Sequence, residues 1–139
     1  AAPSNQGLKA TWHEFKGNKC SEIEKAPVNG TYPVEDVMIP KKVKGNIGLI
    51  IKGYFNAPQD DIYTFALLSD DGSTLTIDSE QIVDNDGPHG PKEIVGQKAL
   101  AKGYHPMELR YFDQNGGQLK LKVTGSDGKE IPFTHLYAH

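Results

Sequence analysis

Acidic residues gather in two short stretches that lie close together in the sequence. The first is Asp70-Asp71-Gly72 and the second is Asp84-Asn85-Asp86-Gly87, and each follows a segment with β-strand character. A hairpin turn needs one Asp-Gly at most. The stretches are therefore either two ordinary turns, or part of a site that gathers oxygen atoms around a cation. The residues themselves leave both interpretations open.

The kinds of metal that such a site could hold are limited by the remaining ligand types. The acidic spacing does not fit an EF-hand loop, which needs regularly spaced carboxylates and a distal glutamate. The single cysteine, Cys20, excludes an internal disulfide and any multi-thiolate site. Four further histidines share no close metal-ligand spacing, so zinc is not expected: His13, His105, His135 and His139. A cation at this site would therefore be bound by oxygen atoms.

The second stretch also carries side chains that suit a sugar. Asn85 and His89 hold directional polar groups of the kind that bind sugar hydroxyls. Alternatively, the asparagine bonds its own backbone and the histidine packs between Pro88 and Pro91. Both interpretations stay open at this point.

Size and charge limit the remaining function classes. The chain has 139 residues and a net charge of -3, which fits one domain spanning 1–139. It is too short for a catalytic barrel of roughly 250 residues. The acidic balance gives no reason to expect nucleic acid, and no apolar run is long enough for membrane insertion. The chain lacks an initiator methionine, so we expect a domain excised from a longer protein.

Short alternating segments bounded by turn residues recur along the chain, and no clean helical period is present. This pattern predicts an all-β fold, an antiparallel β-sandwich or barrel. The segment 16–33 is expected to be mostly loop, with one short helical turn at Ser21–Lys25. The expected strands are Leu8–Phe15, Ile47–Phe55, Ile62–Ser69, Ser73–Asp78, Gln81–Asp84, Glu93–Leu100, Tyr104–Phe112, Gln118–Gly125 and Glu130–Tyr137.

Sugar-binding modules commonly expose an aromatic platform, so the position of each ring matters. Five rings fall inside strand patterns and are expected in the core: Tyr54, Tyr63, Phe65, Tyr111 and Phe112. Trp12 is the expected exception. The lack of aromatic residues in the loops counts against a carbohydrate function.

An ordered set of short motifs resembles the PA-fourteen domain family, named after the anthrax protective antigen. The set comprises Tyr-Thr-Phe, Ser-Asp-Asp-Gly-Ser, Ile-Asp, Asp-Asn-Asp-Gly-x-His-Gly, Lys-Gly-Tyr-His-Pro and Tyr-Phe-x-x-x-Gly-Gly, and the match as a whole covers roughly Ile47–Val123. The resemblance implies an antiparallel β-sandwich or barrel. It also implies an extracellular, periplasmic or cell-surface location.

The resemblance implies a function without catalysis. Family members serve as carbohydrate-binding or accessory modules of secreted bacterial glycoside hydrolases, notably β-N-acetylhexosaminidases. The expected partners are a glycan and the catalytic domain of the parent chain. The alternatives are a purely structural domain that packs on a catalytic domain, and an adhesin-type lectin of the cell surface.

The resemblance also assigns the acidic residues. In the adhesin branch of the family, paired aspartates joined by a cis peptide bond bind calcium, and Asp70 and Asp71 match them. The second ligand position falls on Asp113, and backbone carbonyls near Asn115 and Gly117 complete the set. The alternative remains a hairpin turn at Asp70-Asp71 whose carboxylates cap backbone amides.

Overall fold

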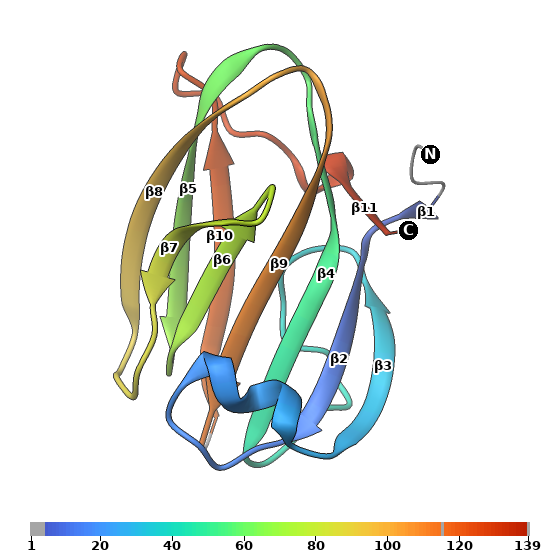
Figure 1. Ribbon diagram of the computed structural model, residues 1–139, viewed down its shortest axis with the longest axis vertical. Coiled ribbons are helices and arrows are strands. Elements are labelled where there is room, and N and C mark those ends of the chain that lie inside the picture. The colour runs from blue at the N-terminus through green and yellow to red at the C-terminus, as the bar shows by residue number, and fades with distance from the viewer. Residues whose placement is uncertain (1–4, 115, 139) are drawn as a thin grey trace.

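The computed structural model describes residues 5–114 and 116–138, and strands dominate it (Figure 1). Two 3-10 helices, η1 (Cys20–Lys25) and η2 (Phe133–His135), are the helical elements of the described chain. The strands are β1 (Asn5–Gln6), β2 (Leu8–Glu14), β3 (Val28–Val34), β4 (Ile47–Ala57), β5 (Asp61–Asp70), β6 (Ser73–Ile77), β7 (Glu80–Asn85), β8 (Lys92–Leu100), β9 (Gly103–Asp113), β10 (Gln118–Thr124) and β11 (Leu136–Ala138).

The strands form two antiparallel sheets that pack face to face. The larger sheet has the order β1-β11-β4-β9-β6-β7, and β2 joins it by pairing with both β3 and β4. The smaller sheet has the order β10-β5-β8. Side chains alternate between the two faces of a strand, so each sheet turns one row of residues toward the space between the layers. The predicted antiparallel β-sandwich is confirmed.

Alternation in β5 shows how the core is built. Tyr63, Phe65 and Leu67 are at most 1% exposed, whereas Ile62 is 53% exposed. The inward rings pack edge to face on Phe55 of β4, with centroids 5.3 Å and 5.7 Å away for Tyr63 and Phe65. Each such edge-to-face pair stabilises the packing of the two layers by about 0.5–1.5 kcal/mol, in addition to the contribution of the buried apolar area.

A second, smaller core lies on the outer face of the larger sheet. It contains Phe15, Cys20, Ile23, Ile50 and Phe112, all buried. Helix η1 lies over β4 and β9 there (Figure 1). Both faces of these two strands are therefore covered at this end, and only at the other end does the outer face of β4 meet solvent.

Two expectations about the chain termini were incomplete. The segment 16–33 contains the predicted helical turn, but it also contains most of β3. This strand was not predicted, because its sequence includes Gly and Pro residues. Such residues are tolerated because β3, within the described part of the chain, pairs with β2 alone and forms a sheet edge. The expected strand Glu130–Tyr137 is instead a single bridge at Glu130, helix η2 and the short strand β11.

Among the described residues, no helix has the length and apolar character needed to cross a membrane.

Candidate metal centre at the rim of the sandwich

Three aspartates meet at the end of the sandwich where η1 lies. Asp70 ends β5 in the smaller sheet, and Asp113 ends β9 in the larger one. Both strands run toward the same rim (Figure 1). Asp71 follows in the β5–β6 turn. One carboxylate oxygen from each of the three residues lies within 4.8 Å of those of the other two.

This separation is compatible with one shared cation. Calcium binds oxygen at roughly 2.3–2.6 Å, so two ligands on opposite sides of the ion are about 5 Å apart. Asp113 is only 4% exposed, while Asp70 and Asp71 are half-buried. The cluster is therefore partly accessible to solvent at Asp70 and Asp71.

Two backbone amides hold the Asp71 carboxylate in place. Its Oδ1 accepts a hydrogen bond from the His89 N–H at 3.2 Å, and its Oδ2 accepts one from the Gln114 N–H, also at 3.2 Å. The Asp70-Asp71 peptide bond is cis, as the resemblance implied. Asp71 thus joins the β7–β8 loop to the β9–β10 loop.

The hydroxyl of Tyr111 lies beside the three aspartates and is affected by their charges. Its side chain is fully buried, and its hydroxyl donates a 2.6 Å hydrogen bond to the Asp70 carbonyl. Burial raises the pKa of Tyr111 well above its ordinary value, and the charges of Asp113, Asp70 and Asp71 raise the pKa further. Three carboxylates thus act on one buried hydroxyl, and a cation among them would relieve their mutual repulsion.

Two glycines allow the loops to approach so closely. A β-carbon at Gly117 would lie 2.0 Å from the Asp70 carbonyl oxygen and 2.9 Å from Cγ of Asp113. A β-carbon at Gly72 would lie 2.7 Å from the backbone of Gly87. Side chains at these positions would push the β9–β10 and β7–β8 loops away from the cluster. The backbone at Gly117, predicted as a ligand position, therefore lies directly against two of the three aspartates.

The sequence left open whether the Asn85 side chain binds a sugar or supports the backbone. It is 2% exposed, and its Nδ2 donates to the carbonyls of Leu67 at 3.1 Å and Lys92 at 2.8 Å. It therefore joins the end of β7 to β5 and β8. A sugar hydroxyl could reach this amide only after the loop had moved, so the structure favours the structural interpretation.

His89 also supports its own loop. Its Nδ1 lies 2.7 Å from the Gly90 carbonyl oxygen, and its Nε2 lies 2.8 Å from the Asn85 carbonyl oxygen. Both ring nitrogens therefore face backbone acceptors. The contact of His89 with the candidate site is made by its backbone N–H and not by its ring. Asn115, the remaining predicted residue, lies outside the described residues.

The second acidic stretch stays apart from the cluster. Asp86 Oδ1 accepts hydrogen bonds from the N–H groups of Cys20 at 3.0 Å and Gly87 at 2.8 Å. Asp84 Oδ1 accepts one from the Asp86 N–H at 3.2 Å. This stretch is thus a turn that anchors η1 through Asp86.

The aromatic residues were only partly placed by the sequence. Tyr63, Phe65, Tyr111 and Phe112 are buried as expected, but Tyr54 is half-buried on the outer face of the larger sheet. The expected exception, Trp12, packs against the main core. Two outward tyrosines were missed, and their rings touch edge to face with centroids 5.4 Å apart: Tyr104 and Tyr137. Their outward positions in β9 and β11 follow only from the observed strand register.

Comparison with known proteins gives the family directly. The model of the PA14 domain matches residues 4–133, nearly the whole chain. The chain belongs to the PA14 domain family. None of the curated proteins matches the chain in sequence.

Solved structures with the same fold are distant in sequence. A structure described as "PA14 sugar-binding domain from RTX adhesin" matches with a TM-score of 0.81 and 17% identity, over 98% of this chain and 100% of that one. The A domain of epithelial adhesin 6 from Candida glabrata, in complex with Galb1-3GlcNAc, matches with a TM-score of 0.72 and 13% identity, over 100% of this chain and 89% of that one. A β-glucosidase from Kluyveromyces marxianus in complex with glucose matches with a TM-score of 0.66 and 17% identity, over 86% of this chain and 16% of that enzyme.

Proposed function

We propose that this PA14 domain is a non-catalytic glycan-binding module whose rim binds a sugar through calcium. The observation that carries the proposal is the convergence of Asp70, Asp71 and Asp113 within 4.8 Å at one end of the sandwich. Three carboxylates at this spacing suit a hard divalent cation that binds oxygen. Without a cation they repel one another.

The residues at this site would have different roles. The three aspartates hold the ion, and the amides of His89 and Gln114 fix the orientation of the Asp71 carboxylate. Calcium would supply open coordination positions for a pair of sugar hydroxyls. The exposed parts of the β7–β8 and β9–β10 loops then border the sugar and select among sugars by shape.

The printed descriptions of the similar structures support a glycan as the ligand. One is a sugar-binding domain of an adhesin, and two epithelial adhesin domains hold Galb1-3GlcNAc or Galb1-4GlcNAc. These descriptions concern other proteins at 13–17% identity. They make a β-linked disaccharide a reasonable first probe.

The parent chain is a second part of the proposal. The β-glucosidase match covers only 16% of that enzyme, so a domain of this fold occurs there as one part of a larger hydrolase. We infer that this domain is attached to a secreted bacterial glycoside hydrolase, with a β-N-acetylhexosaminidase as the specific expectation. A cell-surface adhesin is the alternative, which the adhesin neighbours favour.

A glycan array probed with and without calcium tests the function. We expect signals that chelator removes and that Asp71→Asn abolishes. The matched control is Asp84→Asn, an exposed acidic residue of the neighbouring loop outside the cluster, which should bind like the unmodified chain. Silence on all sugars while calcium still raises Tm would leave a metal-stabilised structural domain and refute glycan binding. No response of Tm to calcium would refute the metal site itself.

A further inference from the structure

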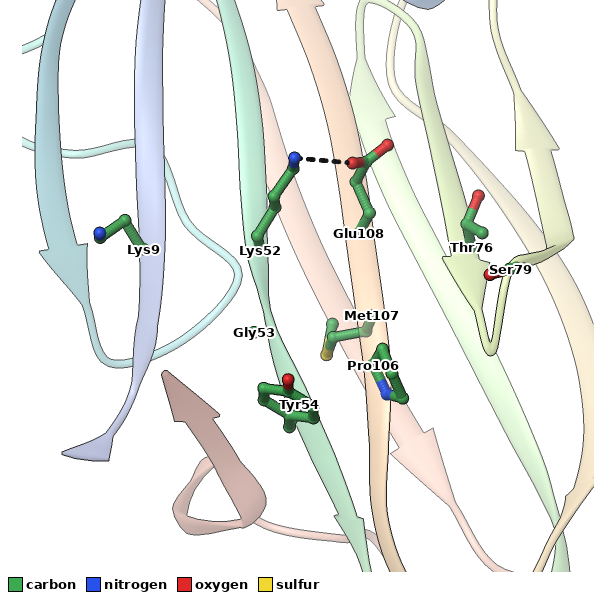
Figure 2. Close-up of a pocket in the computed structure, with 9 residues that line it drawn as sticks. All are labelled: Lys9, Lys52, Gly53, Tyr54, Thr76, Ser79, Pro106, Met107 and Glu108. Atoms are coloured by element: carbon green, nitrogen blue, oxygen red, sulfur yellow. Dashed lines mark ion pairs between the residues drawn. The ribbon is translucent and has the colours of Figure 1, made fainter. Parts of the chain in front are cut away.

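A groove of about 510 Å³ lies on the outer face of the larger sheet, beyond the part covered by η1. Pockets of roughly 300–1,000 Å³ are the usual size for small-molecule ligands. Side chains of four neighbouring strands line the groove: Lys9 of β2, Lys52 and Tyr54 of β4, Pro106 and Glu108 of β9, and Thr76 of β6 (Figure 2). It is formed by the sheet face, whereas the candidate metal centre is formed by the rim loops.

Strand register explains why these side chains meet. Lys52 pairs with Glu108, and Tyr54 pairs with Pro106, in the antiparallel ladder of β4 and β9. Facing residues in such a ladder project to the same side of the sheet. Because the intervening Met107 is buried in the core, these four side chains must point outward.

A pair of opposite charges lies in the groove. Lys52 Nζ is 3.5 Å from Oε1 of Glu108, as the dashed line in Figure 2 shows. Glu108 Oε2 also accepts a hydrogen bond from Arg110 Nε at 3.0 Å. Arg110 in turn donates to the carbonyl of Cys20 in η1 at 3.3 Å. The Glu108 carboxylate is therefore oriented before any ligand arrives, which lowers the cost of binding.

Aromatic and ring surfaces complete the groove. Tyr54 lies beside Pro106 in Figure 2. The edge-to-face pair of Tyr104 and Tyr137 extends the same surface, because Tyr137 pairs with Tyr54 and Tyr104 lies two residues before Pro106. Tyr104 is 41% exposed. Three tyrosines thus cluster on one open sheet face.

We propose that this groove is a second saccharide-binding subsite, for a neutral oligosaccharide segment, and that it works without calcium. A sugar ring has apolar C–H faces and a rim of hydroxyls. The tyrosine and proline rings match the faces, while the Lys52–Glu108 pair offers a donor and an acceptor side by side for neighbouring hydroxyls. The hydroxyls of Thr76 and Ser79 line the opposite side of the groove (Figure 2).

The charged groups beside the rings of the groove are paired with one another. Lys52 is paired with Glu108, and Glu108 is shared with Arg110. Lys9 adds an exposed cation on the β2 side of the groove, so neutral probes test the rings and the Lys52–Glu108 pair without a contribution from ligand charge. The proposal is independent of the rim site, since none of these residues belongs to the aspartate cluster.

The test uses two-dimensional amide NMR of the labelled chain in the presence of a chelator. The probes are chitohexaose and cellohexaose, two neutral linear oligosaccharides. We expect concentration-dependent shifts at the amides of Lys52, Gly53, Met107 and Glu108. Tyr54→Ala should weaken binding about fivefold to tenfold, the usual value of one aromatic contact. Glu108→Gln should weaken it by a similar factor without removing the ring surface.

Controls separate this subsite from general unfolding and from the rim. Tyr32→Ala removes a half-buried tyrosine that packs against the core away from the groove, and it should leave the affinity unchanged. Shifts confined to the amides of Asp71, His89 and Gln114, or no shift with either probe, would overturn the proposal. The proposal would also be overturned if the Tyr54→Ala and Glu108→Gln variants bound the probes with the same affinity as the unmodified chain. Calcium-dependent shifts at the rim amides report the other site separately.

Discussion

Replacing Asp113 by asparagine should have opposite effects on stability with and without calcium. Asp113 lies 4% exposed between two other carboxylates, with ligand atoms within 4.8 Å. The asparagine would keep the shape of the side chain and remove one charge. In the presence of chelator this change removes two repulsive pairs, whereas in calcium it removes one ligand of the ion.

The magnitude follows from Coulomb's law. At 4.8 Å, two unit charges repel by about 3 kcal/mol at an effective dielectric constant of about 20, and by about 1 kcal/mol in water. The half-exposed cluster lies between these limits. Weakened hydrogen bonds to the side chain offset part of the gain, at about 1 kcal/mol each. We therefore expect the chelated Asp113→Asn chain to be about 1 kcal/mol more stable, which raises Tm by about 4 °C.

Calcium should reverse the order. The unmodified chain gains about 2.7 kcal/mol when free calcium is about a hundred times Kd, a rise in Tm of about 10 °C. Loss of an outer partner of a metal ligand weakens affinity by about 10–100-fold, so loss of a direct ligand should cost at least about a hundredfold. The variant would then gain less than about 0.5 kcal/mol.

Thermal unfolding followed by circular dichroism, in chelator and in a calcium titration, measures both effects. The expected result is a crossing: the variant melts higher in chelator and lower in calcium. Asp84→Asn should shift neither curve relative to the unmodified chain. An equal loss of Tm in both conditions would mean that Asp113 has only a structural role, and would refute the metal argument.

Three further predictions concern the rim and its surroundings. Gly117→Ala should lower Tm and weaken the calcium response, because its β-carbon would lie 2.0 Å from the Asp70 carbonyl oxygen; Gly90→Ala, with no atom within 4 Å, should do neither in the same melts. Tyr111→Phe leaves that carbonyl without its hydroxyl donor and should cost about 1–3 kcal/mol in urea unfolding, while the calcium response persists; an unchanged midpoint would contradict the role of the hydroxyl. Burial, followed by a neighbouring carboxylate, raises the pKa of Cys20, so a thiol reagent at mildly alkaline pH should label it only after denaturation. Because the folded pKa lies above the ordinary value of about 8.5, the contribution of this thiol to stability falls as the pH rises above that value, and rapid labelling of the folded chain would contradict the assignment.

The strands and the family could be read from the sequence because they depend on local patterns. Alternation in β5 and β10 and the turn residues between strands predicted the sandwich, and β5 through β10 lie within about two residues of their expected bounds. β3 was not predicted because Gly30 and Pro33 locally disfavour a strand. Pairing with β2 overrides that preference.

The orientation of Tyr54 shows where alternation fails. β4 is apolar on both faces from Ile47 to Ile51, because η1 covers its outer face there and buries Ile50. In such a run the inward and outward rows cannot be told apart, so Tyr54 was assigned to the core. Its place on the open face depends on where η1 stops, which is a property of the packed chain.

The position of the paired aspartates at a strand end and the antiparallel sandwich could both be predicted from the sequence, because they depend on neighbouring residues. The position of Asp113 beside Asp70 and Asp71, and the inward orientation of Asn85, follow instead from the packing of the whole chain. The same is true of the three tyrosines that share one open face. These arrangements depend on which strand ends meet across two sheets and on which face the short helix covers, and contacts between residues far apart in the chain fix both.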